Sequence, residues 1–458
     1  MERVPFTRSI LSRGAAAEGP QWIPALNCPF SGGRGLKIFY GWRIAAAAAG
    51  LQFLHAGLLL QAFGAYVAVL SEERGWSKTV LAGGAALQSI EGALIGPVLG
   101  WLIDRFGPRA MVQAGILCLG LGLIAMSRID SLGGFYAAIV LIAIGASLSG
   151  YFPLSVALVH WFQRRRARSL ALMGLGMAAG GLLVPLVGWV MQAHGWRVAA
   201  FASGVIAIVA GWPLACIVRR DPAQMGQQMD GVAATASMTG SAAGELSAPQ
   251  EFSALEALRT PAFWLLGLGH AFALLVVSTV NVHAISHLKE GLGYSLPQAS
   301  FVITVMTLSQ AGGVLLGAAF GDRLNKRRAA AGCMLLHMVG LLMLTYATHP
   351  LMVGAFAVLH GLAWGLRGPL MQAIRADYFG LEAIGTIMGI SAFIISIGQV
   401  GGPMLAGASA DLTGSYRTGF TFIALVAGSG SLLFLFARKP RSLGREVARG
   451  SALPRGNL

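Results

Sequence analysis

Gly100-Trp-Leu-Ile-Asp104-Arg105-Phe-Gly107-Pro-Arg109 is a short polar turn between two apolar runs of this 458-residue chain. Gly107 permits a sharp backbone turn there, and Asp104 can cap a helix or pair with a cation. A second copy lies about 220 residues later, where Asp322-Arg323 ends another apolar run. The repetition predicts that the chain consists of two copies of one helical unit.

The apolar runs around these turns have the length of membrane-spanning helices, which need about 20 mostly apolar residues. Six such runs precede the polar stretch 219–259, and six follow it. The expected helices are 43–69, 79–102, 110–128, 133–160, 169–193, 197–218, 262–287, 297–320, 329–347, 350–375, 384–410 and 418–437.

Other landmarks repeat at nearly the same offset, since Gly180-Gly181 is matched by Gly401-Gly402 and Trp161-Phe162 by Tyr378-Phe379. Such repeats are typical of secondary transporters, with the substrate site near the midplane between them. We therefore expect an all-α membrane protein of twelve transmembrane helices in two pseudo-symmetric six-helix bundles. The expected parts are a disordered cytoplasmic tail (1–42), an N-terminal bundle (43–218), a cytoplasmic linker (219–259), a C-terminal bundle (260–437) and a cytoplasmic tail (438–458).

The composition also favours a membrane location. Hydrophobic residues make up 55% of the chain and charged residues 11%, against roughly 25% charged residues in soluble domains. The net charge of +15 does not indicate nucleic-acid binding, because the basic residues lie in short loops between apolar runs. Most of them fall on the side that holds both termini. The positive-inside rule therefore predicts a multi-pass protein of the plasma (inner) membrane with both termini in the cytoplasm.

The sequence offers little sign of catalysis or of a bound cofactor. The four cysteines, Cys28, Cys118, Cys216 and Cys333, are too far apart to suggest a metal pair or a disulfide framework. The sequence shows no nucleophile–base pair, phosphate loop or ATP motif, so an enzyme is not expected. The expected partners are the lipid bilayer, a small-molecule substrate and protons, with no cofactor and no nucleic acid, and the chain is expected to be a monomer.

The turn motif resembles the loop signature of the major facilitator superfamily, G-x-x-x-D-R-x-G-x-R. The second copy, Ala318-Ala-Phe-Gly-Asp322-Arg323-Leu-Asn325-Lys326-Arg327, departs from that signature at Ala318 and Asn325. Two copies in a twelve-helix chain make the resemblance specific. It implies alternating access between two six-helix bundles.

A narrower resemblance is to the monocarboxylate-porter and oxalate/formate-antiporter branch, and it covers roughly 40–438. It is carried by Tyr40-Gly41-Trp42, Gly75-Trp76-Ser77, the segment from Trp161 to Ala171, and Gly195-Trp196-Arg197. The resemblance implies transport of a small organic anion with a proton or by exchange. The chain departs from the proton-coupled relatives in its eighth helix, because 301–310 lacks their Asp and Arg. The anion contact is then expected elsewhere.

Two ionisable residues lie deep in the expected helices, where charges are costly and mark functional candidates. Arg367 lies in the tenth helix, which lines the cavity in the superfamily fold, and its guanidinium suits a substrate carboxylate. It could instead pair with a carboxylate or with backbone carbonyls and fix that helix. Glu91 in the second helix is the candidate proton carrier, because burial favours the protonated form of a carboxyl group. The alternative is a structural partner for Arg367 or for a backbone amide near Pro97.

Histidines and aromatic residues on the cavity-type helices complete the candidate site. His55 and His283 are the histidines expected to contact substrate, and His270 and His360 lie on the same set of helices. Any of them could equally be a satisfied hydrogen-bonding group of the helix packing. Tyr151 and Trp364 are expected in the pocket wall, although each suits packing as well.

Glycines in the fifth and eleventh helices, among them Gly181 and Gly402, are expected at the interface between the halves, where they would serve either rocking or tight packing. An alternative function is efflux of amphipathic or drug-like compounds, which a hydrophobic cavity without central charge would favour.

Overall fold

The computed structural model describes residues 39–162, 165–231, 252–320, 323–380 and 384–440. All of them belong to the compact unit Ile38–Leu458, and the other unit, Met1–Lys37, lies outside the described residues. The expected tails 1–42 and 438–458 are thus described only at 39–42 and 438–440, and the linker 219–259 only in part. Asp322 of the second turn motif also lies outside the described residues.

The N-terminal half is built from helices of unequal length. They are α1 (Tyr40–His55), the π-helix η1 (Ala56–Leu60), α2 (Phe63–Arg74), α3 (Lys78–Met126), α4 (Leu132–Ser149), α5 (Tyr151–Trp161), α6 (Arg166–Ala179), the 3-10 helix η2 (Gly180–Leu183), α7 (Val184–His194) and α8 (Trp196–Ile217).

The C-terminal half consists of longer, mostly uninterrupted helices. They are α10 (Pro261–Leu292), α11 (Leu296–Phe320), α12 (Lys326–Thr345), α13 (Pro350–Phe379), α14 (Ile384–Thr413) and α15 (Arg417–Phe436). The described part of the linker forms η3 (Pro222–Met225), η4 (Met229–Gly231) and α9 (Ala254–Leu258). Ser253 caps α9, and its backbone and hydroxyl donate to the Glu256 carboxylate at 2.9 Å, which lowers the pKa of that carboxyl group.

Eleven helical segments within the described residues are long and apolar enough to cross a membrane. α1, η1 and α2 together form one of them, as do α4 with α5 and α6 with α7. The remaining expected helix, 79–102, is the second in chain order. It forms the first part of α3, which turns at Gly107 with a φ of 80°. The predicted all-α fold of two six-helix bundles is therefore confirmed.

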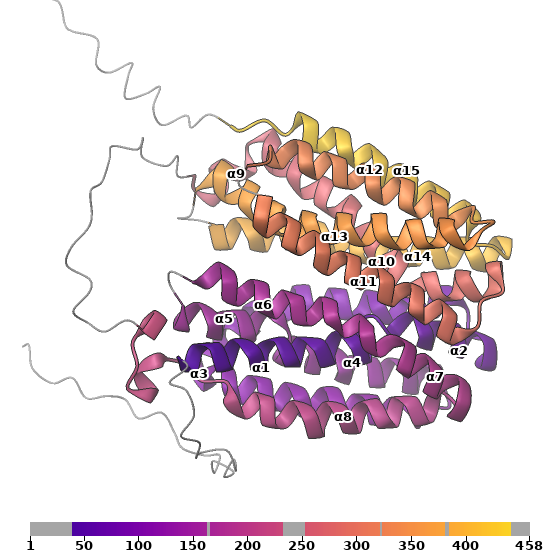
Figure 1. Ribbon diagram of the computed structural model, residues 1–458, viewed down its shortest axis with the longest axis horizontal. Helices are drawn as coiled ribbons and strands as arrows, with labels where there is room; N and C mark the ends of the chain where they lie inside the picture. The colour runs from indigo at the N-terminus through magenta and orange to yellow at the C-terminus, as the bar shows by residue number, and fades with distance from the viewer. Residues whose placement is uncertain (1–38, 163–164, 232–251, 321–322, 381–383, 441–458) are drawn as a thin grey trace, which may run out of the picture. The chain divides into compact units, whose positions relative to one another are not determined.

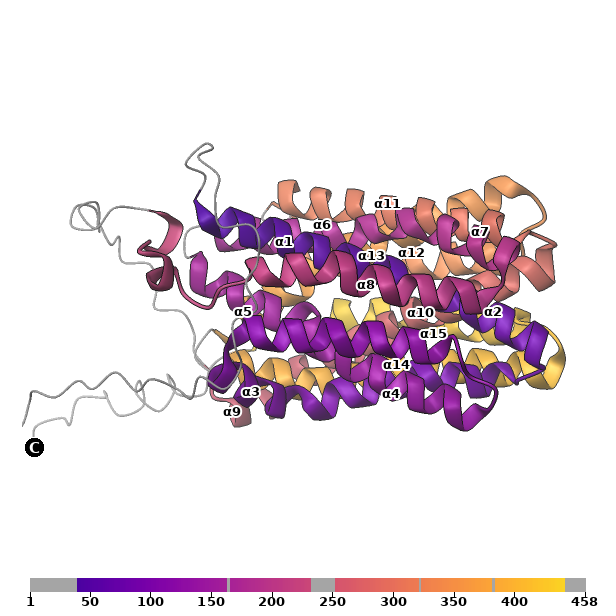
Figure 2. The same ribbon diagram turned by 90° about the horizontal axis from the view of Figure 1, so that it is seen from below.

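Successive helices alternate in direction along one common axis, as Figure 1 and Figure 2 show. The start of α1 and the end of α15 lie at the left of Figure 1. By the alternation of the helices, the turn at Gly107 within α3 belongs to the same end of the bundle. We call this the Gly107 end. The opposite end carries the turns at Gly75, Gly195 and Gly293, and we call it the Gly195 end.

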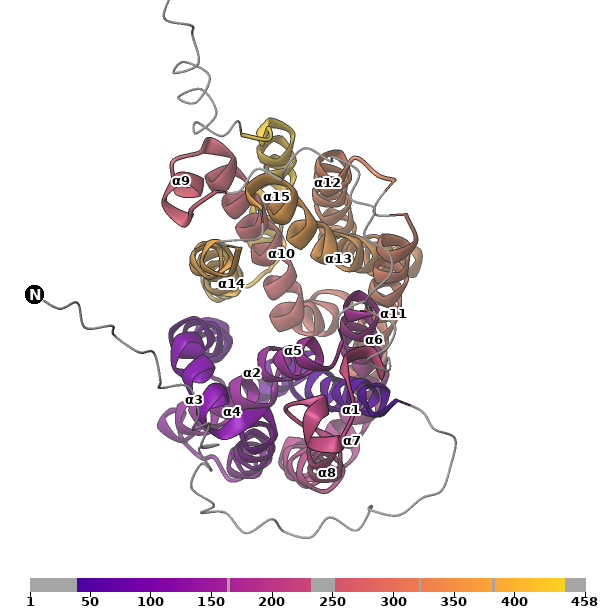
Figure 3. The same cartoon turned by 90° about the vertical axis from the view of Figure 1, so that its left-hand side faces the viewer.

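The helices of the two halves form neighbouring groups when viewed along the axis (Figure 3). α3 packs against α14, α2 against α10, and α6 and α7 against α11. These contacts form the seam between the halves, and they bring together segments that are far apart in the sequence.

Glycine permits the closest helix crossings in both halves. A Cβ atom at Gly181 would overlap Thr307, and one at Gly188 would overlap Ser300, so these two glycines of the fifth helix lie at the seam. Gly398 and Gly402 of α14 instead face the backbone of α10 within their own half. Both helices also use glycine at the other kind of contact, since Gly176 and Gly180 face α1 and η1 within the N-terminal half and Gly407 of α14 faces the Lys78–Thr79 backbone across the seam.

Candidate functional site

A cavity of about 560 Å³ lies between the two halves. Both halves supply its walls, through α1, η1, α2, α3, α4, α5 and α6 on one side and α10, α13 and α14 on the other. Its polar and aromatic lining residues include His55, Phe63, Gln88, Ser89, Glu91, Ser147, Tyr151, Ser278, Asn281, Trp364, Ser396 and Gln399.

Glu91 is the acidic side chain among these lining residues. One oxygen, Oε2, accepts a hydrogen bond from the Ser147 hydroxyl at 2.7 Å, and the buried Oε1 has no partner. Both residues belong to the N-terminal half. Among the described residues neither Arg367 nor another cation forms an ion pair with Glu91, so the expected alternative of a Glu91–Arg367 pair is not formed there.

Local breaks in the helices shape the wall of the N-terminal half. The π-helix η1 begins directly after His55, and its Leu59 and Leu60 line the cavity. Such single π-turns frequently occur at functional sites. The fourth membrane helix breaks at Gly150, whose φ of −80° and ψ of −153° are extended, and Tyr151 begins α5 there. Both breaks occur next to predicted site residues.

The structure therefore brings four predicted site residues together in the cavity wall: His55, Glu91, Tyr151 and Trp364. Tyr151 is 53% exposed, as suits a side chain that faces open space. The buried Nδ1 of His55 has no hydrogen-bond partner.

Arg367 is not among the residues that line the cavity. It lies one helical turn beyond Trp364 on α13 but is buried inside the C-terminal half, with 1% of its surface exposed. Its Nε and Nη1 have no hydrogen-bond partner. The guanidinium lies close enough to His270, His337 and His360 for its charge to act on all three.

His283 lies away from the cavity, near the Gly195 end. Its Nε2 contacts the carbonyl oxygen of Pro403 at 3.0 Å, and its Nδ1 contacts the Tyr416 hydroxyl at 3.1 Å. His283 therefore links α10 to the backbone of α14 and to Tyr416, which directly precedes α15. These contacts fit the packing interpretation of this histidine.

The first turn motif has the expected backbone. Gly100 and Asp104 lie in the helical backbone of α3, and Gly107 provides the positive φ of the turn. The Arg105 guanidinium lies over the ring of Trp101 at 5.3 Å. In the second copy the Arg323 amide donates to the carbonyl of Phe320, and the Arg323 side chain is exposed.

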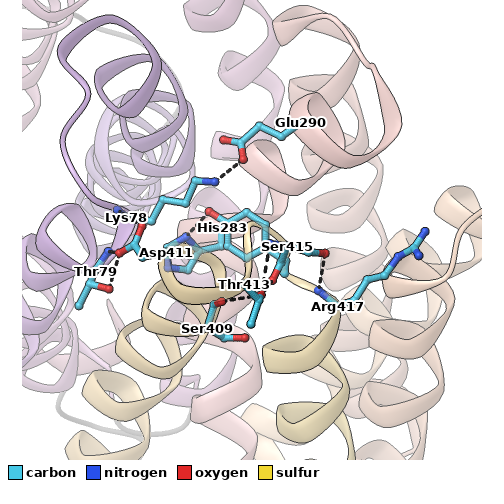
Figure 4. Close-up of polar contacts among 10 residues, drawn as sticks. Lys78, Thr79, His283, Glu290, Ser409, Asp411, Thr413, Ser415 and Arg417 are labelled. Carbon is cyan, nitrogen blue, oxygen red and sulfur yellow. Dashed lines mark hydrogen bonds and ion pairs between the residues drawn. The ribbon is translucent and has the colours of Figure 1, made fainter.

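A cluster of polar contacts that the sequence did not predict joins the halves at the Gly195 end (Figure 4). The Asp411 carboxylate of α14 accepts hydrogen bonds from the backbone amides of Lys78 and Thr79 at 2.9 and 2.8 Å, and from the Thr79 hydroxyl at 2.6 Å. The Lys78 ammonium pairs with Glu290 of α10 and lies 5.0 Å from the centre of the Tyr416 ring.

A second ion pair, Lys289–Glu72, joins α10 to α2 at the same end. We call these contacts, made by Glu72, Lys78, Thr79, Lys289, Glu290 and Asp411, the cross-half cluster. The first amides of a helix have no acceptor within it. The Asp411 carboxylate, from the other half, accepts the first two amides of α3 and so caps that helix. The cross-half cluster holds the two halves together at the Gly195 end.

Two six-helix halves that enclose a polar cavity at their seam define a membrane protein of the secondary-transporter class. The chain belongs to the Major Facilitator Superfamily, whose family model matches residues 48–282 and 266–455. Secondary transport is thus the general activity that fold and family support.

The named relatives include transporters of one branch and a sensor. Monocarboxylate transporter 13 of Bos taurus is 25% identical over 413 residues, which cover 86% of this chain and 89% of that protein. Monocarboxylate transporter 11 of Homo sapiens is 27% identical over 423 residues, with coverages of 88% and 84%. The membrane sensor protein UhpC of Salmonella typhimurium is 27% identical over 349 residues, with coverages of 70% and 77%. The predicted resemblance to the monocarboxylate-porter branch is confirmed.

A solved structure shares the fold. It is a bacterial homologue of the human lysosomal transporter Spinster, described as inward-facing and unoccupied. The TM-score is 0.63 at 17% sequence identity, and the match covers 89% of this chain and all of that one. The comparison supports the fold alone.

Proposed function

We propose that this protein is a secondary active transporter of a small organic anion, similar to a monocarboxylate, that works by alternating access. The observation that carries the proposal is the buried Arg367 guanidinium, which has unpartnered donors beside a cavity between the halves. A buried cation without a partner is costly. A carboxylate that reaches Arg367 would remove that cost and would gain paired, charge-assisted hydrogen bonds.

Coupling to protons follows from the position of Glu91. An ionised carboxylate in the cavity wall repels an incoming anion, and protonation of Glu91 removes that repulsion. The proton and the anion would then favour each other's binding, as symport requires, whereas exchange would leave Glu91 protonated throughout the cycle. His55, Tyr151 and Trp364 would contact the body of the substrate from the cavity wall.

In the proposed topology the protein lies in the plasma (inner) membrane, and the Gly107 end and both termini face the cytoplasm. The loops of the Gly107 end carry the Arg-rich segments, as the positive-inside rule requires. The cross-half cluster would then close the outer end, so the structure would correspond to an inward-facing state.

The experiment is thermal unfolding of the purified protein with a panel of mono- and dicarboxylates, since a ligand that binds the folded state raises its apparent stability. Arg367→Gln should abolish the stabilisation by the best carboxylate. Arg328→Gln is the matched control, because it removes an exposed charge from α12. An Arg367→Gln protein that folds and responds to carboxylates like the wild type would refute the proposal.

Efflux of amphipathic compounds is the second candidate, and one observation favours it. The cavity wall includes Phe63, Met177 and Trp364, and Arg367 lies behind that wall. Lipophilic cations and neutral amphipathic compounds in the same panel would discriminate, because efflux predicts stabilisation by these compounds and none by small carboxylates.

A further inference from the structure

The C-terminal half contains a second buried cation that the proposed site does not use. Arg375 lies two helical turns beyond Arg367 on α13, and 2% of its surface is exposed. Its Nη1 and Nη2 each donate to Nδ1 of His270 on α10 at 3.3 Å, and Nη1 also donates to the carbonyl of Met371 at 3.3 Å.

The positive charges of Arg367 and Arg375 are not neutralised by any described residue. Neither Arg367 nor Arg375 forms an ion pair with any acidic residue of the described chain. His270 does not neutralise either arginine, because an Nδ1 that accepts from Arg375 belongs to an uncharged imidazole. Charge-assisted bonds are typically 2.7–2.9 Å long, so the contacts of 3.3 Å are loose ones. Arg375 therefore has an uncharged side-chain partner, and Nε and Nη1 of Arg367 have no hydrogen-bond partner.

Neither His270 nor Arg375 lines the cavity, but each lies in helical register with residues that do. His270 lies one turn before Leu274, which lines the cavity together with Val277 and Asn281. On α13, Arg375 lies eleven residues after Trp364, which is close to three full turns, so the two residues share a face. The pair is thus in register with the cavity wall.

The face of α13 that carries Trp364 and Arg375 extends toward the Gly107 end. Arg375 is one turn before the end of α13 at Phe379. Next to it in sequence, Asp377 pairs with Lys326 at the start of α12, at 2.7 Å. The rise of a helix places Arg375 roughly 12 Å beyond Arg367 along the axis. Arg367 and Arg375 thus mark two levels between the cavity and the Gly107 end.

We propose that Arg375, held in place by His270, is a second carboxylate-binding position on the transport path, between Arg367 and the Gly107 end. The ligand class is a small carboxylate, which accepts two hydrogen bonds from one guanidinium. An anion that leaves the cavity toward the Gly107 end would then exchange one buried cation for another. This inference rests on the proposed function.

The test measures carboxylate affinity in Arg375→Gln. The purified wild type, Arg375→Gln and Arg328→Gln are unfolded thermally over a concentration series of formate, lactate and oxalate, with lactamide as the uncharged control. Loss of a charge-assisted contact should raise the half-stabilising concentration about tenfold or more in Arg375→Gln. Arg328→Gln, which removes an exposed charge near the same end, should match the wild type. Lactamide should stabilise none of them.

The outcomes separate the inference from the function on which it rests. If no carboxylate stabilises the wild type, the proposed function is wrong, and the inference falls with it. If carboxylates stabilise wild type and Arg375→Gln at equal concentrations, Arg375 is only a clamp between α10 and α13, even when the unliganded melting temperature falls. Arg375→Lys keeps the positive charge but loses the planar guanidinium, which binds a carboxylate through two hydrogen bonds. Should Arg375→Gln not fold, Arg375→Lys carries the same test, with a smaller expected loss of affinity.

Discussion

Removal of the Asp411 carboxylate should release the two halves at the Gly195 end. In Asp411→Ala the amides of Lys78 and Thr79 and the Thr79 hydroxyl lose their acceptor in the other half. Loss of an N-cap costs about 1 kcal/mol, and loss of a negative charge at a helix N-terminus costs about 0.3–1 kcal/mol at an exposed site. The sum, about 1–2 kcal/mol, corresponds to a shift of about 5–30-fold in a two-state equilibrium.

The assay is a distance distribution between two spin labels, one on each half at the Gly195 end, in a background without the native cysteines. Asp411→Ala should populate a longer distance that the parent protein scarcely shows. Asp130→Ala is the matched control, because this exposed carboxylate at the same end pairs with Arg74 and Arg197 within the N-terminal half. The reasoning is refuted if Asp411→Ala leaves the distribution unchanged, or if Asp130→Ala shifts it equally.

Three further substitutions test the packing, the His283 contact and the coupling. Gly365→Ala places a methyl group against the backbone of α11 and should destabilise the protein by about 1–3 kcal/mol in thermal unfolding, whereas Gly368→Ala, with no atom near its added Cβ, should not. His283→Ala removes the contacts with the Pro403 carbonyl and the Tyr416 hydroxyl and should lower the melting temperature at an unchanged carboxylate affinity; a weaker carboxylate affinity would indicate that His283 takes part in substrate binding. Glu91→Gln should abolish uphill uptake in proteoliposomes and spare counterflow, and loss of both would indicate a structural role.

Helix positions could be predicted well because apolar run length sets them directly. The run 297–320 became Leu296–Phe320, and 197–218 became Trp196–Ile217. The breaks at η1 and Gly150 were not predicted, because each depends on what packs against the backbone from other helices. A local apolar pattern contains no information on such contacts.

Side-chain direction was the weakest part of the site prediction. Lipid-facing and interior faces of a membrane helix are both apolar, so the periodicity that orients a soluble helix is lost. Trp364 and Arg367 are three residues apart, yet the first lines the cavity and the second is buried behind it. The cross-half contact of Asp411 was missed for another reason: it joins residues more than three hundred positions apart. An acidic residue near the end of an apolar run was the one available signal.

The repeat relates the backbones of the two halves but not their charges. At the offset of the turn motifs, Glu91 corresponds to Ser309 of α11, and at the offset of the Trp161 and Tyr378 landmarks, Arg367 corresponds to Gly150. The acid therefore occurs only in the first copy, and this buried cation only in the second. We infer that the duplicated halves divide the work, so that one binds the proton and the other the anion. Because Glu91 and Arg367 lie on opposite sides of the seam, each bound species would neutralise a charge in its own half before the halves move against each other.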